Sequence, residues 1–156
     1  MLKPNDAYLL GYYGKQNAGD DALLYASSWA AKHFLNCNKL KVSVFSKSEH
    51  AHLANPLKPT YFSGYERLQH YKVAITSKRL IVGGGSVFCD ERDIQLKRHL
   101  IGLTNKKKSM AVGVSIGPFN NTAAEKACQG FLNEVGFVGV RDQVSYDIAK
   151  SLAPMA

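Results

Sequence analysis

The sequence predicts an α/β protein with a Rossmann-like open parallel sheet of five to six strands and helices on both faces. Short apolar runs alternate with segments of helical periodicity along the chain, which favours parallel strands joined by crossover helices. Several runs end in glycine-rich turns, at 11–14, 83–85 and 117. No linker or sequence repeat divides the chain, so we expect residues 1–156 to form a single α/β domain.

Each element follows from a local pattern. Strands are expected where apolar and β-branched residues run together, and helices where apolar residues recur every three or four positions. The predicted strands are 7–10, 41–46, 79–82, 109–114 and 137–140. The predicted helices are 20–35, 93–103, a segment opening at 122, and 142–152. Prolines and a glycine interrupt 49–71, where a short strand near Tyr61 and a helix after Gly64 are both possible.

Start and stop signals support the helices. Asp20 and Asp21 stand where the first helix starts, which favours capping and complements the helix dipole. Residues 36–38 are expected to stop that helix. The run Thr122–Glu125 fits a capping box, and Asp142 is expected to open the last helix.

Composition narrows the class of protein. The net charge is +8, but the basic residues are mostly dispersed, and the tightest run is Lys106–Lys108. Nucleic-acid binding would need a basic stripe with interleaved aromatics or a known module, and neither is present. We therefore expect a surface that attracts anions, either substrates or anionic lipid.

The cysteines and the N-terminal segment indicate a cytoplasmic protein. Cys37, Cys89 and Cys128 are widely spaced and form no Cys-x-x-Cys pair, which is typical of reduced thiols in the cytosol. The first residues do not form a signal peptide, because the apolar run after them breaks at Gly11. No stretch approaches the ~20 apolar residues of a membrane helix, so any contact with the inner face of the membrane would be peripheral.

The glycine turns are the first candidates for a binding site. Gly83–Gly85 would let backbone amides approach a ligand closely, and Ser86 adds a hydroxyl. The alternative is a tight turn packed against a neighbouring helix. The segment 11–19 lacks the Gly-x-Gly-x-x-Gly spacing of a dinucleotide fingerprint, and no Gly-Lys-Ser/Thr of a P-loop follows it.

Arg141 directly follows the last predicted strand, at the edge where the glycine turns also lie. An arginine there could make bidentate contacts to a phosphate or carboxylate. A local pair with Asp142, or a cap at the helix start, is an equal alternative. The remaining candidates favour structural roles: Asp20 and Asp21 as caps, and His50-Ala51-His52 as a surface loop without a third metal ligand.

These pieces together resemble the polysaccharide pyruvyl transferase family. The matching segments are Gly11–Gly14, Asn17–Leu24, Gly83–Asp90, Gly113–Phe119 and Val140–Tyr146. Each is weak alone, but all stand in family order at predicted strand ends. One departure is Asp21, where the family usually carries Glu.

The resemblance implies a fold and a reaction. It predicts the first domain of a two-domain, GT-B type transferase that moves a pyruvyl group from phosphoenolpyruvate onto a sugar as a ketal. The acceptor would be a saccharide or lipid-linked saccharide of an exopolysaccharide or cell-wall polymer, with no metal and no cofactor beyond the donor. The residues expected to bind substrate are Asn17, Asp20, Gly84, Gly85, Ser86, Ser115 and Arg141.

The family is roughly twice as long as this chain, as two ordinary domains would be. Its second half would carry the histidine and further arginines assigned to catalysis, so no general acid or base is placed here. We expect this chain to be the amino-terminal half and a poor enzyme alone. Two alternatives stay open: half of a nucleotide-sugar glycosyltransferase, and a non-catalytic binding or assembly subunit.

Overall fold

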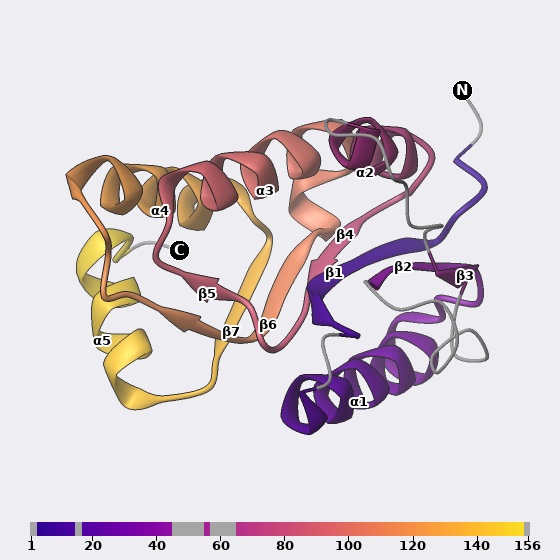
Figure 1. Ribbon diagram of the computed structural model, residues 1–156, viewed down its shortest axis with the longest axis horizontal. Helices are drawn as coiled ribbons and strands as arrows, with labels where there is room; N and C mark the ends of the chain where they lie inside the picture. The colour runs from indigo at the N-terminus through magenta and orange to yellow at the C-terminus, as the bar shows by residue number, and fades with distance from the viewer. Residues whose placement is uncertain (1–2, 15–16, 45–54, 57–64, 155–156) are drawn as a thin grey trace.

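Parallel strands form one open sheet with helices on both faces (Figure 1). The computed structural model describes residues 3–14, 17–44, 55–56 and 65–154. The strands are β1 (Ala7–Tyr13), β2 (Leu40–Val44), β3 (Asn55–Pro56), β4 (Leu80–Val82), β5 (Val87–Phe88), β6 (Met110–Ile116) and β7 (Phe137–Val140). The helices are α1 (Ala18–Leu35), α2 (Tyr65–Ile75), α3 (Glu91–Leu103), α4 (Thr122–Glu134) and α5 (Gln143–Leu152), with a 3-10 turn η1 (Lys106–Lys108). Five strands have three or more residues, which confirms the predicted fold class.

The order of the strands creates a switch point beside β1. The hydrogen-bonded order is β3-β2-β1-β4-β6, and β5 and β7 both pair with β6. Leu9 of β1 pairs with Val42 on one side and with Ile81 of β4 on the other. Figure 1 shows α1 on one face and α2, α3 and α4 on the other, and α5 packs beside α4 at the β7 side of the sheet. The connections after β1 and β4 therefore diverge to opposite faces, and such a divergence opens a ligand crevice at the carboxyl ends of the strands.

Strand β1 is buried on both faces. Ala7 and Leu9 belong to the hydrophobic cluster that includes α1, whereas Tyr8 and Leu10 belong to the cluster that includes α2, α3 and α4. Burial on both faces explains why the segment is an unbroken apolar run rather than an alternating one. Each such large side chain contributes about 1.5–3 kcal/mol to folding, so β1 is firmly anchored beneath the edge that carries the site.

Asp142 opens α5 and Asn36 ends α1 as expected, but the caps at the starts of α1 and α4 differ from those predicted. Asn17 caps α1 by accepting a hydrogen bond from the Gly19 amide, and Asp20 lies in the first turn instead. The capping box predicted at Thr122 is wrong: Asn121 is the cap, and its side chain accepts from the Ala124 amide at 2.8 Å. In both cases an asparagine just upstream satisfies the same free amides.

The remaining elements fall close to the predicted ones. The helix expected after Gly64 is present as α2, whereas the strand considered near Tyr61 lies outside the described residues. The two-residue strand β5 was not expected, because so short a segment carries no periodicity. Within the described part of the chain, no helix has both the length and the hydropathy to cross a bilayer.

Candidate functional site

The amino end of α1 reaches the switch point through two polar side chains. The side-chain Nδ2 of Asn17 donates to Asp20 Oδ2 at 2.8 Å, and Asn17 Oδ1 accepts from the Gly19 backbone amide at 3.1 Å. The Asp20 residue is only 8% exposed. Asn17 thus both caps the helix and orients a buried carboxylate toward the end of β4.

The triple glycine accommodates this carboxylate. A Cβ on Gly85 would lie 2.3 Å from Asp20 Oδ1, and the φ angle of Gly85 is +78°. A Cβ on Gly84 would lie 2.6 Å from a methyl carbon of Leu23 on α1. The alternative of a tight turn packed on a neighbouring helix is therefore correct for Gly84, while Gly85 also borders a cavity described below.

Contacts along the same edge of the sheet connect the remaining predicted residues, Ser86, Ser115 and Arg141. The Ser115 amide donates to the Ser86 carbonyl at 3.1 Å, which places the end of β6 beside the glycine turn. The Ser115 hydroxyl accepts a hydrogen bond from Arg141 Nε and donates to Asp142 Oδ2 at 3.2 Å. The seven predicted substrate-binding residues therefore lie along one edge of the sheet. We call them the carboxyl-edge wall: Asn17, Asp20, Gly84, Gly85, Ser86, Ser115 and Arg141.

Arg141 is anchored at its inner nitrogen and open at its outer ones. Its side chain is 49% exposed, and its Nε lies 3.8 Å from Asp142 Oδ2, longer than a good charge-assisted hydrogen bond. Within the described residues, no hydrogen bond involves its two terminal nitrogens. The guanidinium therefore offers its fork, the part that binds carboxylate or phosphate in bidentate fashion, to the edge of the sheet.

Asp142, rather than Arg141, caps α5. Its Oδ1 accepts from the Ser145 amide at 2.7 Å, and the Ser145 hydroxyl accepts from the Ile116 amide at 2.9 Å. Hydrogen bonds from Ser145, with smaller effects of Ser115 and Arg141, hold the pKa of the Asp142 carboxyl below its usual range. The ionised cap ties α5 to the end of β6 and so fixes the base of the Arg141 side chain.

A cavity of about 560 Å³ adjoins the wall at Gly85 and Ser86. It opens between the ends of β1 and β4 and the helices α2 and α3. Its polar lining consists of Tyr12, Ser43, His70, Ser86, Cys89, Asp90, Asp93 and Lys97, and we call it the β1–β4 pocket. Arg141 and Ser115 do not line it, so the predicted residues divide between this pocket and an open edge beside it.

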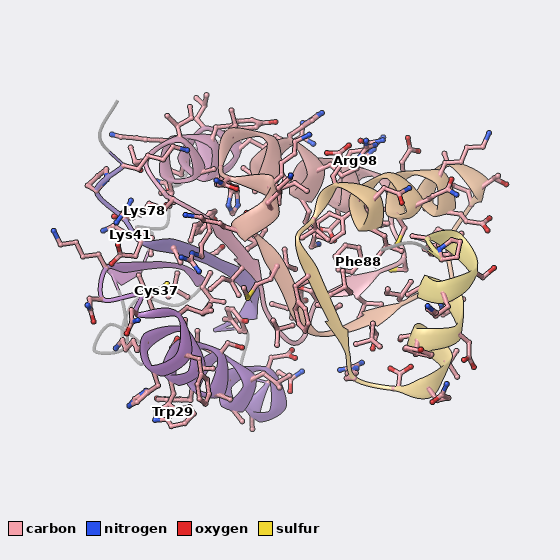
Figure 2. All side chains as sticks on the ribbon, turned by 180° about the vertical axis from the view of Figure 1, so that it is seen from behind. Trp29, Cys37, Lys41, Lys78, Phe88 and Arg98 are labelled. Atoms are coloured by element: carbon pink, nitrogen blue, oxygen red, sulfur yellow. The ribbon has the colours of Figure 1, made fainter. Side chains whose placement is uncertain are left out.

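Two side chains in the β1–β4 pocket, the buried Lys97 and the half-buried His70, were missed by the sequence analysis. Lys97 is only 4% exposed, pairs with Asp93, and holds its Nζ 5.2 Å from the centre of the Phe88 ring, which Figure 2 shows in the interior. His70 bonds through Nδ1 to the hydroxyl of Tyr8, whose pKa burial raises. Lys97 had a signal, because it lies on the face of α3 that also buries Ile94 and Ile101. His70 had none, because its partner is distant in the sequence.

The described residues offer no metal centre. They contain no group of three or more His, Cys, Asp or Glu side chains placed to hold an ion. His50 and His52, which were interpreted as loop residues, lie outside the described part of the chain.

The fold and the edge together define a class: a doubly wound α/β protein whose switch point carries a polar wall, an outward arginine and an adjoining pocket. Residues 17–153 match the sequence profile of the family described as polysaccharide pyruvyl transferase, and the chain belongs to that family. The match covers nearly the whole chain and confirms the resemblance drawn from its motifs. Among curated proteins and solved structures, no significant match is found.

Proposed function

We propose that this chain forms one wall of a pyruvyl transferase cleft, in which the pyruvyl group of phosphoenolpyruvate forms a ketal with two hydroxyls of a sugar and phosphate is released. The observation that carries the proposal is the outward fork of Arg141, held at its Nε by Ser115. Family membership supports the transfer of a pyruvyl group to a saccharide. The Arg141 geometry supports recognition of an anion at this edge.

The donor fits the open edge beside Arg141. Phosphoenolpyruvate carries a carboxylate and a phosphate, and a guanidinium fork matches the geometry of either group. Ser115 and Asp142 hold the side chain by its inner nitrogen and leave the fork for the ligand. The arginine would neutralise the donor's charge and fix its orientation while the acceptor hydroxyl approaches.

The sugar acceptor fits the β1–β4 pocket better than the donor does. Two carboxylates, Asp90 and Asp93, face a single ammonium, Lys97, so the pocket repels a multiply charged anion. Carboxylates accept hydrogen bonds from sugar hydroxyls, and the half-exposed Tyr12 ring at the rim suits the apolar face of a sugar. Donor and acceptor would then meet at Gly85 and Ser86, where the edge and the pocket adjoin.

Proton transfer to the donor's enol carbon requires an acid that we do not assign to this chain. We propose that a second domain of GT-B type supplies it, with this chain as the amino-terminal half. The isolated chain would therefore bind the donor but turn over slowly, because only one wall of the cleft is present.

Titration of the chain with phosphoenolpyruvate, followed by NMR chemical shifts, tests the proposal. Shifts should gather at Ser115, Arg141 and Asp142. Arg141→Ala should lower the affinity for phosphoenolpyruvate at least about tenfold, as expected when a hydrogen-bonded charge pair is lost. The control Arg92→Ala, at an exposed position of α3, should leave this affinity unchanged. Binding of a nucleotide sugar at this edge, with no response to phosphoenolpyruvate, would instead identify a glycosyltransferase half.

A further inference from the structure

The amino edge of the sheet, opposite the candidate site, carries exposed lysines at the start of successive strands. Lys39 directly precedes β2, Lys78 lies two residues before the start of β4, and η1, made of Lys106, Lys107 and Lys108, precedes β6. Because all the strands are parallel, residues that precede them gather at one edge. We call these five side chains the amino-edge lysines.

Backbone contacts show that these lysines form one continuous surface. The Lys39 carbonyl accepts from the Asp6 amide at 2.8 Å, and the Lys78 amide donates to the Asn5 carbonyl at 3.0 Å. The Lys78 carbonyl in turn accepts from the Asn105 amide, next to η1, at 3.2 Å. Figure 2 shows Lys78 and Lys41, the second residue of β2, at the same end of the sheet.

The surface is strongly positive. Asp6 pairs with Lys78 at 2.7 Å, and Glu134 pairs with Lys106 at 2.9 Å. Within the described residues, Lys39, Lys107 and Lys108 make no ion pair. The remaining charge is therefore unneutralised and directed toward solvent.

The opposite edge has the reverse charge. Parallel strands lead into helices at their carboxyl ends, so the acidic first turns and caps of α1, α3 and α5 gather there. These acidic residues are Asp20, Asp21, Asp90, Glu91, Asp93 and Asp142. They outnumber the cations that the structure describes among them, Arg92, Lys97 and Arg141. The molecule thus has a positive edge and a negative edge, and a flat anionic surface would bind it in one orientation.

We infer that the amino-edge lysines dock the protein on an anionic lipid bilayer, with the carboxyl-edge wall facing away from the membrane. The exposed cations of this surface are lysines, whereas the nearby Arg79 and Arg98 are partly buried. Compact, hydrated ammonium charges suit the diffuse charge of a bilayer, whereas defined phosphates favour the arginine fork. Phe137 begins β7 beside η1, where Gly136 abuts Lys107, and is 57% exposed. A bare aromatic ring beside lysines is typical of surfaces that enter the headgroup layer. This inference does not depend on the pyruvyl transfer reaction.

Co-sedimentation of the chain with phosphatidylcholine vesicles, with and without phosphatidylglycerol, tests the inference. The chain should bind only the anionic vesicles, and binding should fall as salt rises toward about 0.15 M. Each surface lysine contributes about fivefold to such binding, so Lys107→Gln with Lys108→Gln should weaken it about 25-fold. The pair Arg92→Gln and Lys126→Gln, exposed near the starts of α3 and α4 and therefore close to the opposite edge, makes the same change in net charge and should weaken it less than about threefold.

Three results would overturn the inference. Equal losses in the two pairs of variants would show that only the net charge matters. Equal binding to neutral vesicles would remove the electrostatic basis. Tighter binding of an RNA oligonucleotide than of anionic vesicles, with the same dependence on Lys107 and Lys108, would assign the surface to nucleic acid. All four substituted side chains are exposed, so the thermal transition of each variant should match that of the parent chain.

Discussion

The carboxylate of Asp20 occupies the space that a side chain on Gly85 would need. A Cβ there would stand 2.3 Å from Asp20 Oδ1, and the +78° φ of Gly85 independently disfavours any other residue. This contact packs the start of α1 against the loop after β4 and so closes the switch point. The glycine turn is therefore shaped by the helix beside it as much as by any ligand.

Gly85→Ala should lower the free energy of unfolding by at least about 1–2 kcal/mol, the cost of a left-handed conformation for alanine, before any displacement of Asp20 is counted. Gly102→Ala is the control, because Gly102 lies in α3 with nothing near its Cβ position. That change should stabilise the chain by about 0.5–1 kcal/mol. Denaturant unfolding of both variants measures the difference, and equal effects would show that the loop relaxes freely.

Ser115 should act on the donor through Arg141. Ser115→Ala removes the hydroxyl that accepts from Arg141 Nε, so the fork loses its fixed direction but keeps its charge. We expect donor affinity to fall about threefold to tenfold, less than for Arg141→Ala. Arg141→Lys should not restore the affinity, because an ammonium has no fork.

The control for this series is Ser151→Ala, an exposed position near the end of α5. It should leave the affinity for phosphoenolpyruvate unchanged in the same titration. A loss as large for Ser115→Ala as for Arg141→Ala would mean that Ser115 itself contacts the donor.

Cys89 should report on the β1–β4 pocket. It lines the pocket and is partly exposed, whereas Cys37 and Cys128 are fully buried. Burial raises the pKa of Cys128 to about 12, so its thiolate is scarce at any mild pH. An alkylating reagent should therefore label only Cys89 in the folded chain and all three cysteines after unfolding, as mass spectrometry would show.

A sugar acceptor in the pocket should slow the labelling of Cys89, while phosphoenolpyruvate alone should not. Equal protection by both compounds would place donor and acceptor in the same pocket. Protection by neither compound would contradict the placement of the acceptor in the β1–β4 pocket.

The fold was predictable because burial leaves a direct trace in the sequence. Segments such as Ala7–Leu10 are apolar throughout because both faces are covered, and the triple glycine marks the end of β4, although β1 continues through Gly11 to Tyr13. Helix caps were less predictable, since Asn17 and Asp20 are both good caps and only the folded chain selects Asn17.

The position of Arg141 was also predictable, because the residue after a parallel strand must lie at the carboxyl edge. The β1–β4 pocket was not. It depends on pairs such as Tyr8 with His70, which are 62 residues apart and meet only through the tertiary fold. Lys97 was the exception, since a lysine among the apolar positions of a helix is unusual without a partner.

Asp6 should make the stability of the chain depend on pH. Its Oδ2 accepts from the amides of Asn38 and Lys39, and its Oδ1 accepts from Lys78 Nζ at 2.7 Å, so one carboxylate joins the starts of β1, β2 and β4. The hydrogen bond from Lys78, followed by that from Lys39, holds the pKa of Asp6 below its usual range. A lowered pKa means that the stabilisation is complete above the unfolded-state value, about 3.9, and is lost as the pH falls through the lower folded value.

Asp6→Asn should therefore cost about 1–2 kcal/mol of unfolding free energy at neutral pH, since hydrogen bonds to a charged, partly buried group are lost. The difference between variant and parent should shrink as the solution is acidified, because the parent carboxylate is then protonated too. Asp147→Asn, at an exposed position of α5, makes the same chemical change and should show little difference at any pH. If the difference in unfolding free energy between Asp6→Asn and the parent stays constant down to acid pH, the charge of Asp6 does not contribute to the stability of the chain.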